Sequence, residues 1–134
     1  GLDIGTRNIG VAVSDETLTI AQGKGVIRRK SDAEAVRQIA ENVRAGGISE
    51  IVVGLPVNMD GSYGERASDS QRIADKIRRA TGKKVVLWDE RLTTRASENM
   101  LIKASVSRKK RKKVVDKIAA QMILQEYLDS LKDR

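Results

Sequence analysis

Apolar and polar residues alternate in short runs through the first 28 positions, a pattern typical of β-strands. Residues 2–5 and 9–14 form two such runs around a tight turn at 6–8. Residues 23–28 form a third run after a second turn near 15–16. Successive strands joined by short turns pair antiparallel. The chain is therefore predicted to begin with three antiparallel strands.

The next segment predicts a helix followed by a buried strand. Ser31 and Glu34 have the spacing of a capping box, in which each side chain hydrogen-bonds to the backbone of the other residue at a helix start. Gly46 and Gly47 end the helix, and residues 51–55 form an apolar run. The expected apolar stripe of the helix consists of Val36, Ile39, Ala40 and Val43.

A second helix and strand repeat this arrangement. Ser62 and Glu65 form another capping box, Gly82 ends the helix, and residues 85–88 form the next apolar run. Both short strands are apolar throughout, which suits parallel central strands that helices cover on two faces. The expected stripe of this helix consists of Ala67, Ser70, Ile73, Ala74 and Ile77.

The last third of the chain predicts two more helices. Thr93 or Thr94 can cap a helix that runs to about residue 103. A basic segment at 105–113 then intervenes, and residues 114–131 form a last long helix. The whole pattern predicts an α/β fold, with three antiparallel strands followed by parallel strands and helices.

Composition narrows both the organisation and the chemistry. At 134 residues, with no internal repeat and no linker, the chain is expected to form a single domain over residues 1–134. It has no Cys and no His, which excludes thiolate catalysis, Ser-His triads and His-ligated metals. Hydrolytic chemistry would therefore depend on carboxylates, Lys or Tyr, most readily with oxygen-bound Mg²⁺ or Mn²⁺.

The chain also lacks the marks of a membrane protein. No apolar run approaches the roughly 20 residues that a spanning helix needs. We expect a cytoplasmic protein that has no targeting segment and does not bind a membrane. With no Phe, one Trp and two Tyr, binding of a nucleic acid would use phosphates rather than stacked bases.

Most of the net charge of +8 lies in one run of six basic residues. The chain has 26 Lys and Arg against 18 Asp and Glu, and without this run the count is 20 against 18. Such a run attracts phosphates, although it can also be a solvated loop or a nonspecific polyanion patch. Its place before a helix start, where backbone N–H groups are unpaired, favours a bound anion. The candidate substrate-binding residues here are Arg108, Lys109, Lys110, Arg111, Lys112 and Lys113.

Three carboxylates stand at unusual places in the predicted elements. Asp3 lies in the middle of the first strand, and Glu90 follows Asp89 just past the carboxyl end of a strand, where α/β sheets usually bind ligands. Asp116 lies on the apolar stripe of the last helix, one turn before Ala120. A favourable helix dipole would explain an acid in the first turn, but not its placement on the buried face.

If these three carboxylates converge, a cation must lie among them. Two carboxylates 4 Å apart repel by about 4 kcal/mol at an effective dielectric of 20. The available cations are a divalent ion or the side chains of Arg7 and Arg91, which are also candidates for binding substrate. For three acids together we expect Mg²⁺ or Mn²⁺, which would support hydrolysis of a phosphodiester.

Four blocks of the sequence together resemble the YqgF/RuvX family. They are residues 1–13, residues 51–62, residues 89–94, and Asp116 with its following apolar residues. The resemblance implies an RNase H-like fold, in which helices flank a mixed five-stranded sheet. It also implies that Asp3, Glu90 and Asp116 are the catalytic and metal-binding set.

The same resemblance implies a cytoplasmic bacterial nuclease. The family is described as processing the 5′ end of pre-16S rRNA in ribosome biogenesis and, earlier, as a Holliday junction resolvase. Asn58 and Asp60 fall in the second block, and we expect them to build the loop beside the substrate cleft.

Other functions are consistent with parts of the pattern. The first strand and its turn also resemble the phosphate-binding hairpin of actin-like and sugar-kinase ATPases, but those enzymes close two such domains around a nucleotide. A module that binds rRNA without cutting it would use the basic run alone. A resolvase of four-way DNA junctions would act as a homodimer, whereas an rRNA nuclease could be a monomer.

Overall fold

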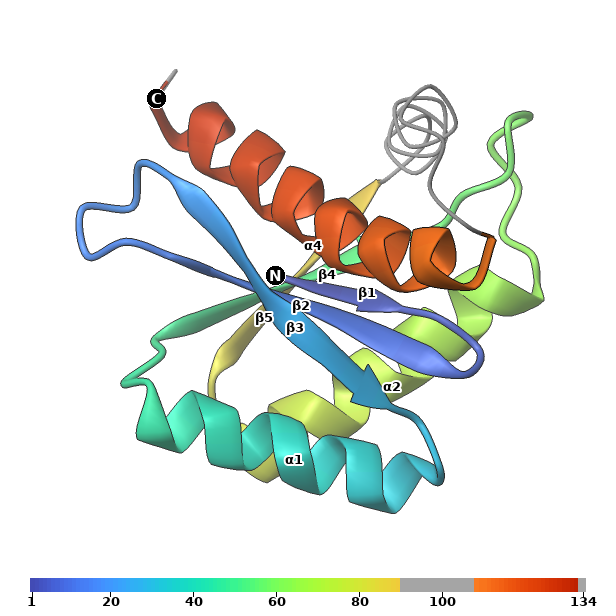
Figure 1. Ribbon diagram of the computed structural model, residues 1–134, viewed down its shortest axis with the longest axis horizontal. Coiled ribbons are helices and arrows are strands. Elements are labelled where there is room, and N and C mark those ends of the chain that lie inside the picture. Colours follow the sequence, from blue (N-terminus) through green and yellow to red (C-terminus); the bar gives the residue numbers. More distant parts are fainter. Residues whose placement is uncertain (90–107, 133–134) are drawn as a thin grey trace.

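The chain folds into a mixed five-stranded sheet with strand order β3-β2-β1-β4-β5, covered by helices on both faces (Figure 1). The computed structural model describes residues 1–89 and 108–132, with side chains through residue 89 and from 117 to 132. The elements are β1 (Leu2–Ile4), β2 (Asn8–Ser14), β3 (Ala21–Arg28), α1 (Asp32–Ala45), β4 (Glu50–Leu55), α2 (Glu65–Thr81), β5 (Lys84–Asp89) and α4 (Arg108–Lys132).

The antiparallel beginning is confirmed. β1 pairs antiparallel with β2, and β2 pairs antiparallel with β3. β3 begins at Ala21, two residues earlier than the alternation indicates, and its pairing with β2 shifts register between Val11 and Ala12.

The parallel half is confirmed in direction but not in its burial. β4 pairs parallel with both β1 and β5. β4 is buried almost throughout, whereas β5 stands at the end of the strand order and is only half buried. The expectation that both apolar strands are central was therefore wrong for β5, because among the described elements it has a strand neighbour on one side alone.

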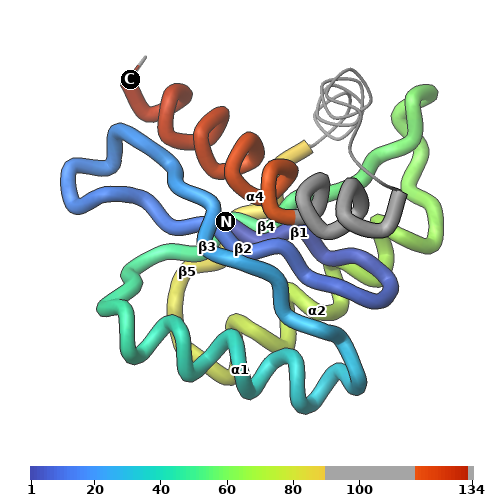
Figure 2. Tube along the Cα trace, viewed as in Figure 1, coloured from blue at the N-terminus to red at the C-terminus, as the bar shows by residue number. Residues whose placement is uncertain are grey.

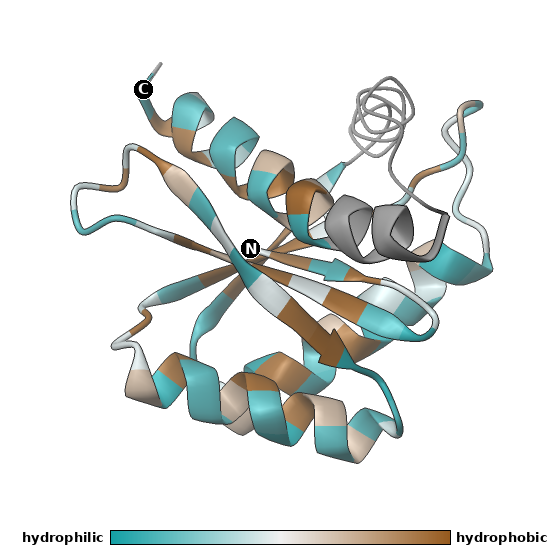
Figure 3. Cartoon of the chain, in the orientation of Figure 1, coloured by the Kyte–Doolittle hydropathy of each residue, from teal (hydrophilic) through white to brown (hydrophobic). Residues whose placement is uncertain are grey.

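The two faces of the sheet carry separate cores. α1 and α2 cover one face and α4 crosses the other, as Figures 1 and 2 show. Leu2 and Ile4 of β1 pack into the core under α1 and α2, with Ile39, Ile73 and others. Ala12, Val52 and the apolar residues of α4 form the second core. Apolar segments accordingly line the sheet and the inner sides of α1 and α2 in Figure 3.

The ends of α1 follow the sequence signals. The Ser31 side chain accepts a hydrogen bond from the Glu34 backbone N–H at 3.2 Å, and Gly46 caps the other end. Ala35, Ile39 and Val43 are the buried residues of the helix, so the expected stripe is confirmed at Ile39 and Val43, whereas Val36 and Ala40 are only half buried. The Glu34 carboxylate binds Arg37 rather than completing the capping box.

The predicted start of α2 was wrong. Gly64 is the N-cap residue, without any side-chain cap, because the Ser62 hydroxyl donates to Asp60 instead. The other end agrees with expectation, since Gly82 adopts a left-handed conformation with φ of 68°. The expected stripe of α2 is confirmed, and all of its members are buried: Ala67, Ser70, Ile73, Ala74 and Ile77.

The last helix begins earlier than predicted. α4 starts at Arg108, so the basic run forms its first two turns and is not a loop in front of it. Asp116 is consequently not in the first turn, which contains no acidic residue. The explanation of Asp116 as a helix-start acid favoured by the dipole is therefore excluded. The expected helix at 93–103 lies outside the described residues.

Candidate functional site

Asp3 is buried in the centre of the sheet. Its relative exposure is 5%, and among the described residues it is the one charged residue in the buried class. Side chains alternate along a strand, and Leu2 and Ile4 pack under α1 and α2, so Asp3 faces α4. Its cross-strand partner on the same face is Gly10, which has no side chain. Across β2, therefore, no side chain stands directly beside Asp3 on the α4 side.

Helix α4 passes closely over β1. A Cβ added at Gly1 would lie 2.8 Å from Leu124 Cβ and 2.9 Å from the Ala120 carbonyl oxygen. α4 begins on the side of the molecule where β1 ends (Figure 1). Asp3 lies two residues past Gly1 along β1, and position 116 lies one turn before Ala120 along α4, about 7 Å and 6 Å respectively in the same direction. The backbone thus places position 116 over the part of β1 that carries Asp3.

The carboxyl end of β5 is fixed against the same helix. Trp88 Nε1 donates to the Glu126 carboxylate at 3.0 Å, and its ring meets the Tyr127 ring edge to face, with centroids 5.7 Å apart. The Tyr127 hydroxyl donates in turn to Glu50. Glu90 comes two residues after Trp88 in the sequence. The strand that leads to Glu90 is therefore attached to α4.

The convergence of the three acids remains a prediction. Glu90 and Arg91 lie outside the described residues, and α4 is described at Asp116 and along the basic run only in its backbone. Within the described part of the chain, no three acidic residues lie close enough together to hold a metal ion. Carboxylate oxygens are the ligands that Mg²⁺ and Mn²⁺ prefer, and Asp3 is the one member of the expected set whose side chain is described.

Arg7 lies exposed in the turn between β1 and β2. Among the described residues it forms no ion pair, so its suggested role as the counter-charge of Asp3 gains no support there. Its backbone carbonyl accepts a hydrogen bond from the Arg29 N–H at 2.7 Å. The exposed side chain remains available to a substrate at this edge.

A second group of charges at this edge was missed by sequence reasoning. We call it the Arg29 cluster: Arg29, Asp32, Asp69 and Arg72. The Arg29 side chain, 9% exposed, pairs with Asp69 at 2.6 Å and Asp32 at 2.9 Å, and Arg72 pairs with the same two acids from outside. Hydrogen bonds from Arg29 hold the pKa of Asp69 below its usual range, and those from Arg72 and then Arg29 do so for Asp32. Both carboxylates therefore stay ionised, and both are already paired with the two guanidinium groups.

The loop of the second sequence block is a closed polar turn. The backbone N–H of Asn58 donates to the Ser62 carbonyl at 2.9 Å, and its side chain donates to the Ser62 hydroxyl at 3.0 Å. Asp60 accepts from the backbone and hydroxyl of Ser62, at 2.9 and 2.6 Å. The expected part of Asn58 and Asp60 in shaping this loop is confirmed, and a role toward substrate stays a prediction.

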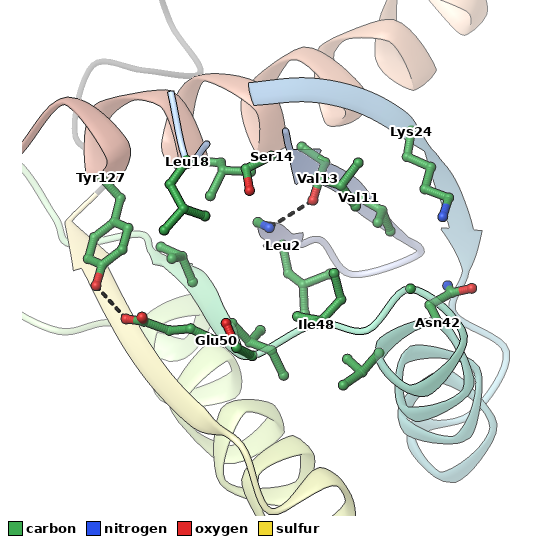
Figure 4. Close-up of a pocket in the computed structure, with 18 of the residues that line it drawn as sticks. Leu2, Val11, Val13, Ser14, Leu18, Lys24, Asn42, Ile48, Glu50 and Tyr127 are labelled. Carbon is green, nitrogen blue, oxygen red and sulfur yellow. Dashed lines mark hydrogen bonds between the residues drawn. The ribbon is translucent and has the colours of Figure 1, made fainter. Parts of the chain in front are cut away.

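A cavity of about 490 Å³ lies at the other edge of the sheet, where the parallel strands begin. Figure 4 shows its lining, with Leu2, Ile48 and Leu18 around it and Tyr127 bound to Glu50 at one side. Most of its wall is aliphatic, and Asp3 is not part of it. The cavity is therefore separate from the acidic site.

The fold and the buried acid together define an RNase H-like protein. A solved structure of Fowlpox virus resolvase with Holliday junction DNA superposes with a TM-score of 0.58, covering 97% of this chain and 95% of that one. The two sequences are 15% identical, so this likeness concerns the fold. The expected RNase H-like architecture is confirmed.

The sequence comparisons identify the family. The family model described as "RuvX: Holliday junction resolvase" matches residues 1–130, and the chain belongs to this family. A protein of Caldanaerobacter subterraneus named "Putative pre-16S rRNA nuclease" is 51% identical, over 99% of this chain and 96% of its own length. Relatives of the same name in Bacillus subtilis and Geobacillus thermodenitrificans are 51% and 53% identical, over 98% and 97% of this chain and 96% of their own lengths. These findings confirm the expected class, a hydrolase that acts on phosphodiester bonds.

None of the helices in the described ranges is long and apolar enough to cross a bilayer.

Proposed function

We propose that this chain is a cytoplasmic nuclease that hydrolyses phosphodiester bonds in pre-16S rRNA, with Asp3, Glu90 and Asp116 as ligands of Mg²⁺ or Mn²⁺. The observation that carries the proposal is Asp3, a carboxylate buried in the middle of a central strand and facing α4. Burial of a carboxylate costs several kcal/mol unless a cation or hydrogen bonds compensate it. We therefore assign Asp3 as the central ligand of the proposed ion.

The two other acids enter from the elements that surround Asp3. Glu90 follows β5, which runs parallel to β1 with β4 between them, so both strands end at the same edge. Asp116 belongs to the helix that crosses Asp3. If Asp3, Glu90 and Asp116 hold a divalent ion, it would lower the pKa of a water molecule and stabilise negative charge on the phosphate. The role of the protein is to hold the ion and to orient the nucleic-acid strand that is cut.

The first two turns of α4 supply the binding of the phosphate backbone. The basic run from 108 to 113 covers about 9 Å along the helix, close to the spacing of one or two phosphates. Positive side chains at a helix N-terminus oppose its dipole, and a bound phosphate removes this conflict while using the unpaired N–H groups. Arg7 lies exposed at the turn after β1 and Arg91 follows Glu90 in the sequence, so both belong to the proposed substrate surface.

A DNA junction is the second candidate substrate. The description of the family model and the likeness to the viral resolvase favour it. Symmetric cutting of a four-way junction requires two active sites related by a two-fold axis, hence a homodimer. Processing of rRNA needs one active site, so a monomer suffices.

One experiment separates these functions. Labelled precursor rRNA and a labelled four-way DNA junction are incubated in parallel with Mg²⁺, Mn²⁺ or EDTA. Asp3→Asn is the inactive variant, and Asp75→Asn, an exposed acid that pairs with Arg78 on α2, is the matched control. We expect metal-dependent cutting of the RNA by the wild type and the control, and none by Asp3→Asn. Cutting of the junction alone establishes a resolvase, and salt-sensitive binding without any cutting establishes a binding module.

A further inference from the structure

The Arg29 guanidinium uses all five of its N–H groups within the protein. Nε and one Nη2 hydrogen donate to Asp32 Oδ1 at 3.1 and 2.9 Å. Nη1 and Nη2 donate to the two oxygens of Asp69 at 2.6 and 2.8 Å. The remaining Nη1 hydrogen donates to the backbone carbonyl of Gly5 at 3.0 Å. Because an Arg side chain has five donors, none is left for a substrate phosphate.

The bond to Gly5 reaches the strand that carries the buried acid. Gly5 directly follows β1, two residues after Asp3. Its N–H donates to the Asn8 carbonyl at 2.9 Å, and a Cβ at Gly5 would lie 2.6 Å from that oxygen, so the turn is tightly closed. The Arg29 N–H also holds the Arg7 carbonyl on the far side of the turn. Arg29 thus fixes the end of β1 through both its side chain and its backbone.

The carboxylates that orient Arg29 come from the two helices on the other face. Asp32 begins α1 and Asp69 lies in the first turns of α2. Arg72 binds both carboxylates at 2.7 and 2.6 Å but is half exposed and does not contact Gly5 in the described structure. Arg72 therefore offers a matched comparison: it has the same two partners but no bond to the strand of Asp3.

We infer that Arg29 is a positioning residue for the acidic site, which holds β1 at a fixed position relative to α1 and α2 and so sets the place of Asp3 beneath α4. This inference rests on the proposed function of Asp3 as a metal ligand. Residues that orient metal ligands typically contribute about 10–100-fold in metal affinity or activity. The ligands of a metal site must lie within about 0.5 Å of their productive positions. A small displacement of β1 is therefore enough to weaken metal binding and cleavage.

The test compares Arg29→Lys with Arg72→Lys. Lys keeps the positive charge but cannot contact both carboxylates and the Gly5 carbonyl at once. For Arg29→Lys we expect a fall in kcat of about tenfold or more and a several-fold rise in the Mg²⁺ concentration for half-maximal cleavage, with the KM for RNA changed less than about twofold. Arg72→Lys should leave all three quantities within about twofold of the wild type. All assays are run well below the melting temperature of each variant.

Two measurements without turnover complete the test. Calorimetric titration with Mn²⁺ should show several-fold weaker binding to Arg29→Lys, and hydrogen exchange at the Gly5 amide should be faster in that variant alone. If Arg29→Lys loses only thermal stability, with kcat and Mn²⁺ affinity unchanged, Arg29 is merely structural and the inference is wrong. If KM rises while kcat holds, Arg29 contacts substrate and the inference is also wrong.

Failure of the proposed function gives a different result. A wild-type protein that binds Mn²⁺ without cutting any substrate contradicts the nuclease proposal, and the Mn²⁺ and exchange measurements still decide the role of Arg29. Should Arg29→Lys fail to fold, Arg29→Gln combined with Asp69→Asn removes the charge from both partners and keeps the cluster nearly neutral. The same kcat and Mn²⁺ readouts then apply to that double variant.

Discussion

The acidic residues on the two faces of the sheet have different surroundings at the edge where the parallel strands end. On the face of α1 and α2, Asp32 and Asp69 are paired with Arg29 and Arg72, so two carboxylates meet two guanidinium groups. On the face of α4, Asp3 is the buried acid of the described residues, and Glu90 and Asp116 are proposed to join it. The first group is paired within the protein, whereas the second is proposed to bind a metal ion.

This difference shows how a structural ion pair can be told from a candidate site. Both kinds of group place acids at the carboxyl edge of a sheet, and residue type alone does not separate them. The protein supplies the cations of the Arg29 cluster in fixed bidentate geometry, which lowers the pKa values of its acids and saturates them. A site for metal-assisted chemistry must instead keep carboxylate oxygens for the ion and its water. The predictions below test this distinction.

The largest effect is expected from Asp3→Asn. The substitution keeps the shape of the side chain but removes the charge that binds the ion, so cleavage should fall by about a hundredfold or more. Metal-free stability should remain sufficient for folding, because Asn nearly matches Asp in shape and volume. Cleavage assays give the first quantity. Thermal unfolding followed by Trp88, the single Trp and a contact of α4, gives the second.

A metal titration makes this test specific to the α4 face. An ion that binds only the folded state stabilises it by about 2.7 kcal/mol at a hundred times its dissociation constant. Saturating Mg²⁺ or Mn²⁺ should therefore raise the melting temperature of the wild type and of the control Asp75→Asn, but not of Asp3→Asn. If Asp3→Asn gains as much as the wild type, the ion binds elsewhere.

The next effect in size concerns the stability of the other face. Arg29→Met leaves Asp32 and Asp69 with Arg72 alone, and their pairing with a nearly buried guanidinium is lost. Breaking a buried pair costs about 3–5 kcal/mol, and because both acids are about a quarter to a third exposed here, we expect about 2 kcal/mol. Urea unfolding measures this free energy. A loss below about 0.5 kcal/mol would show that the cluster is a surface network that contributes little to the free energy of unfolding.

Acid should weaken the same face. The folded-state pKa of Asp69 lies below its unfolded value of about 3.9, so its contribution to stability is fully present above pH 4 and is lost as the pH falls through the folded value. Asp69→Asn removes this contribution at neutral pH. The difference in stability between wild type and Asp69→Asn should therefore be largest at pH 5–7 and shrink below about pH 4. A difference that stays constant to pH 3 would mean that Asp69 does not titrate with folding.

Sequence periodicity predicted the strands, the antiparallel pairing of the first three and the place of Asp3 within the first strand, because each depends on neighbours within a few residues. The start of α2 was misplaced because the Ser62 hydroxyl donates to Asp60. The spacing of Ser62 and Glu65, from which the capping box was predicted, does not reveal this competing partner. The start of α4 was misplaced because consecutive positive charges disfavour a helix start, yet the helix includes them.

The Arg29 cluster shows what sequence could not provide. Arg29 lies 24 residues from Gly5 and 40 from Asp69 along the chain. In the sequence it is one of several polar residues that follow β3. Its partners come together only when α1 and α2 pack on the same face. Asp3 could be singled out because a charge within an apolar strand violates the local pattern, whereas an Arg at the end of a strand does not.

The smallest predicted effect tests whether the basic turns of α4 belong to the α4-face site at all. Each phosphate contact contributes a slope of about −0.9 to the dependence of log K on log salt for duplex DNA, and about −0.7 for a single strand. Replacing Lys109 and Lys112 with Gln should therefore flatten the slope by up to about 1.8 or 1.4, without changing the Mg²⁺ dependence of cleavage. Lys76→Gln with Lys83→Gln, two lysines at the α2 side, is the control of equal charge. If both pairs flatten the slope equally, the protein binds nucleic acid through its overall charge, and the proposed path of the strand along the start of α4 is wrong.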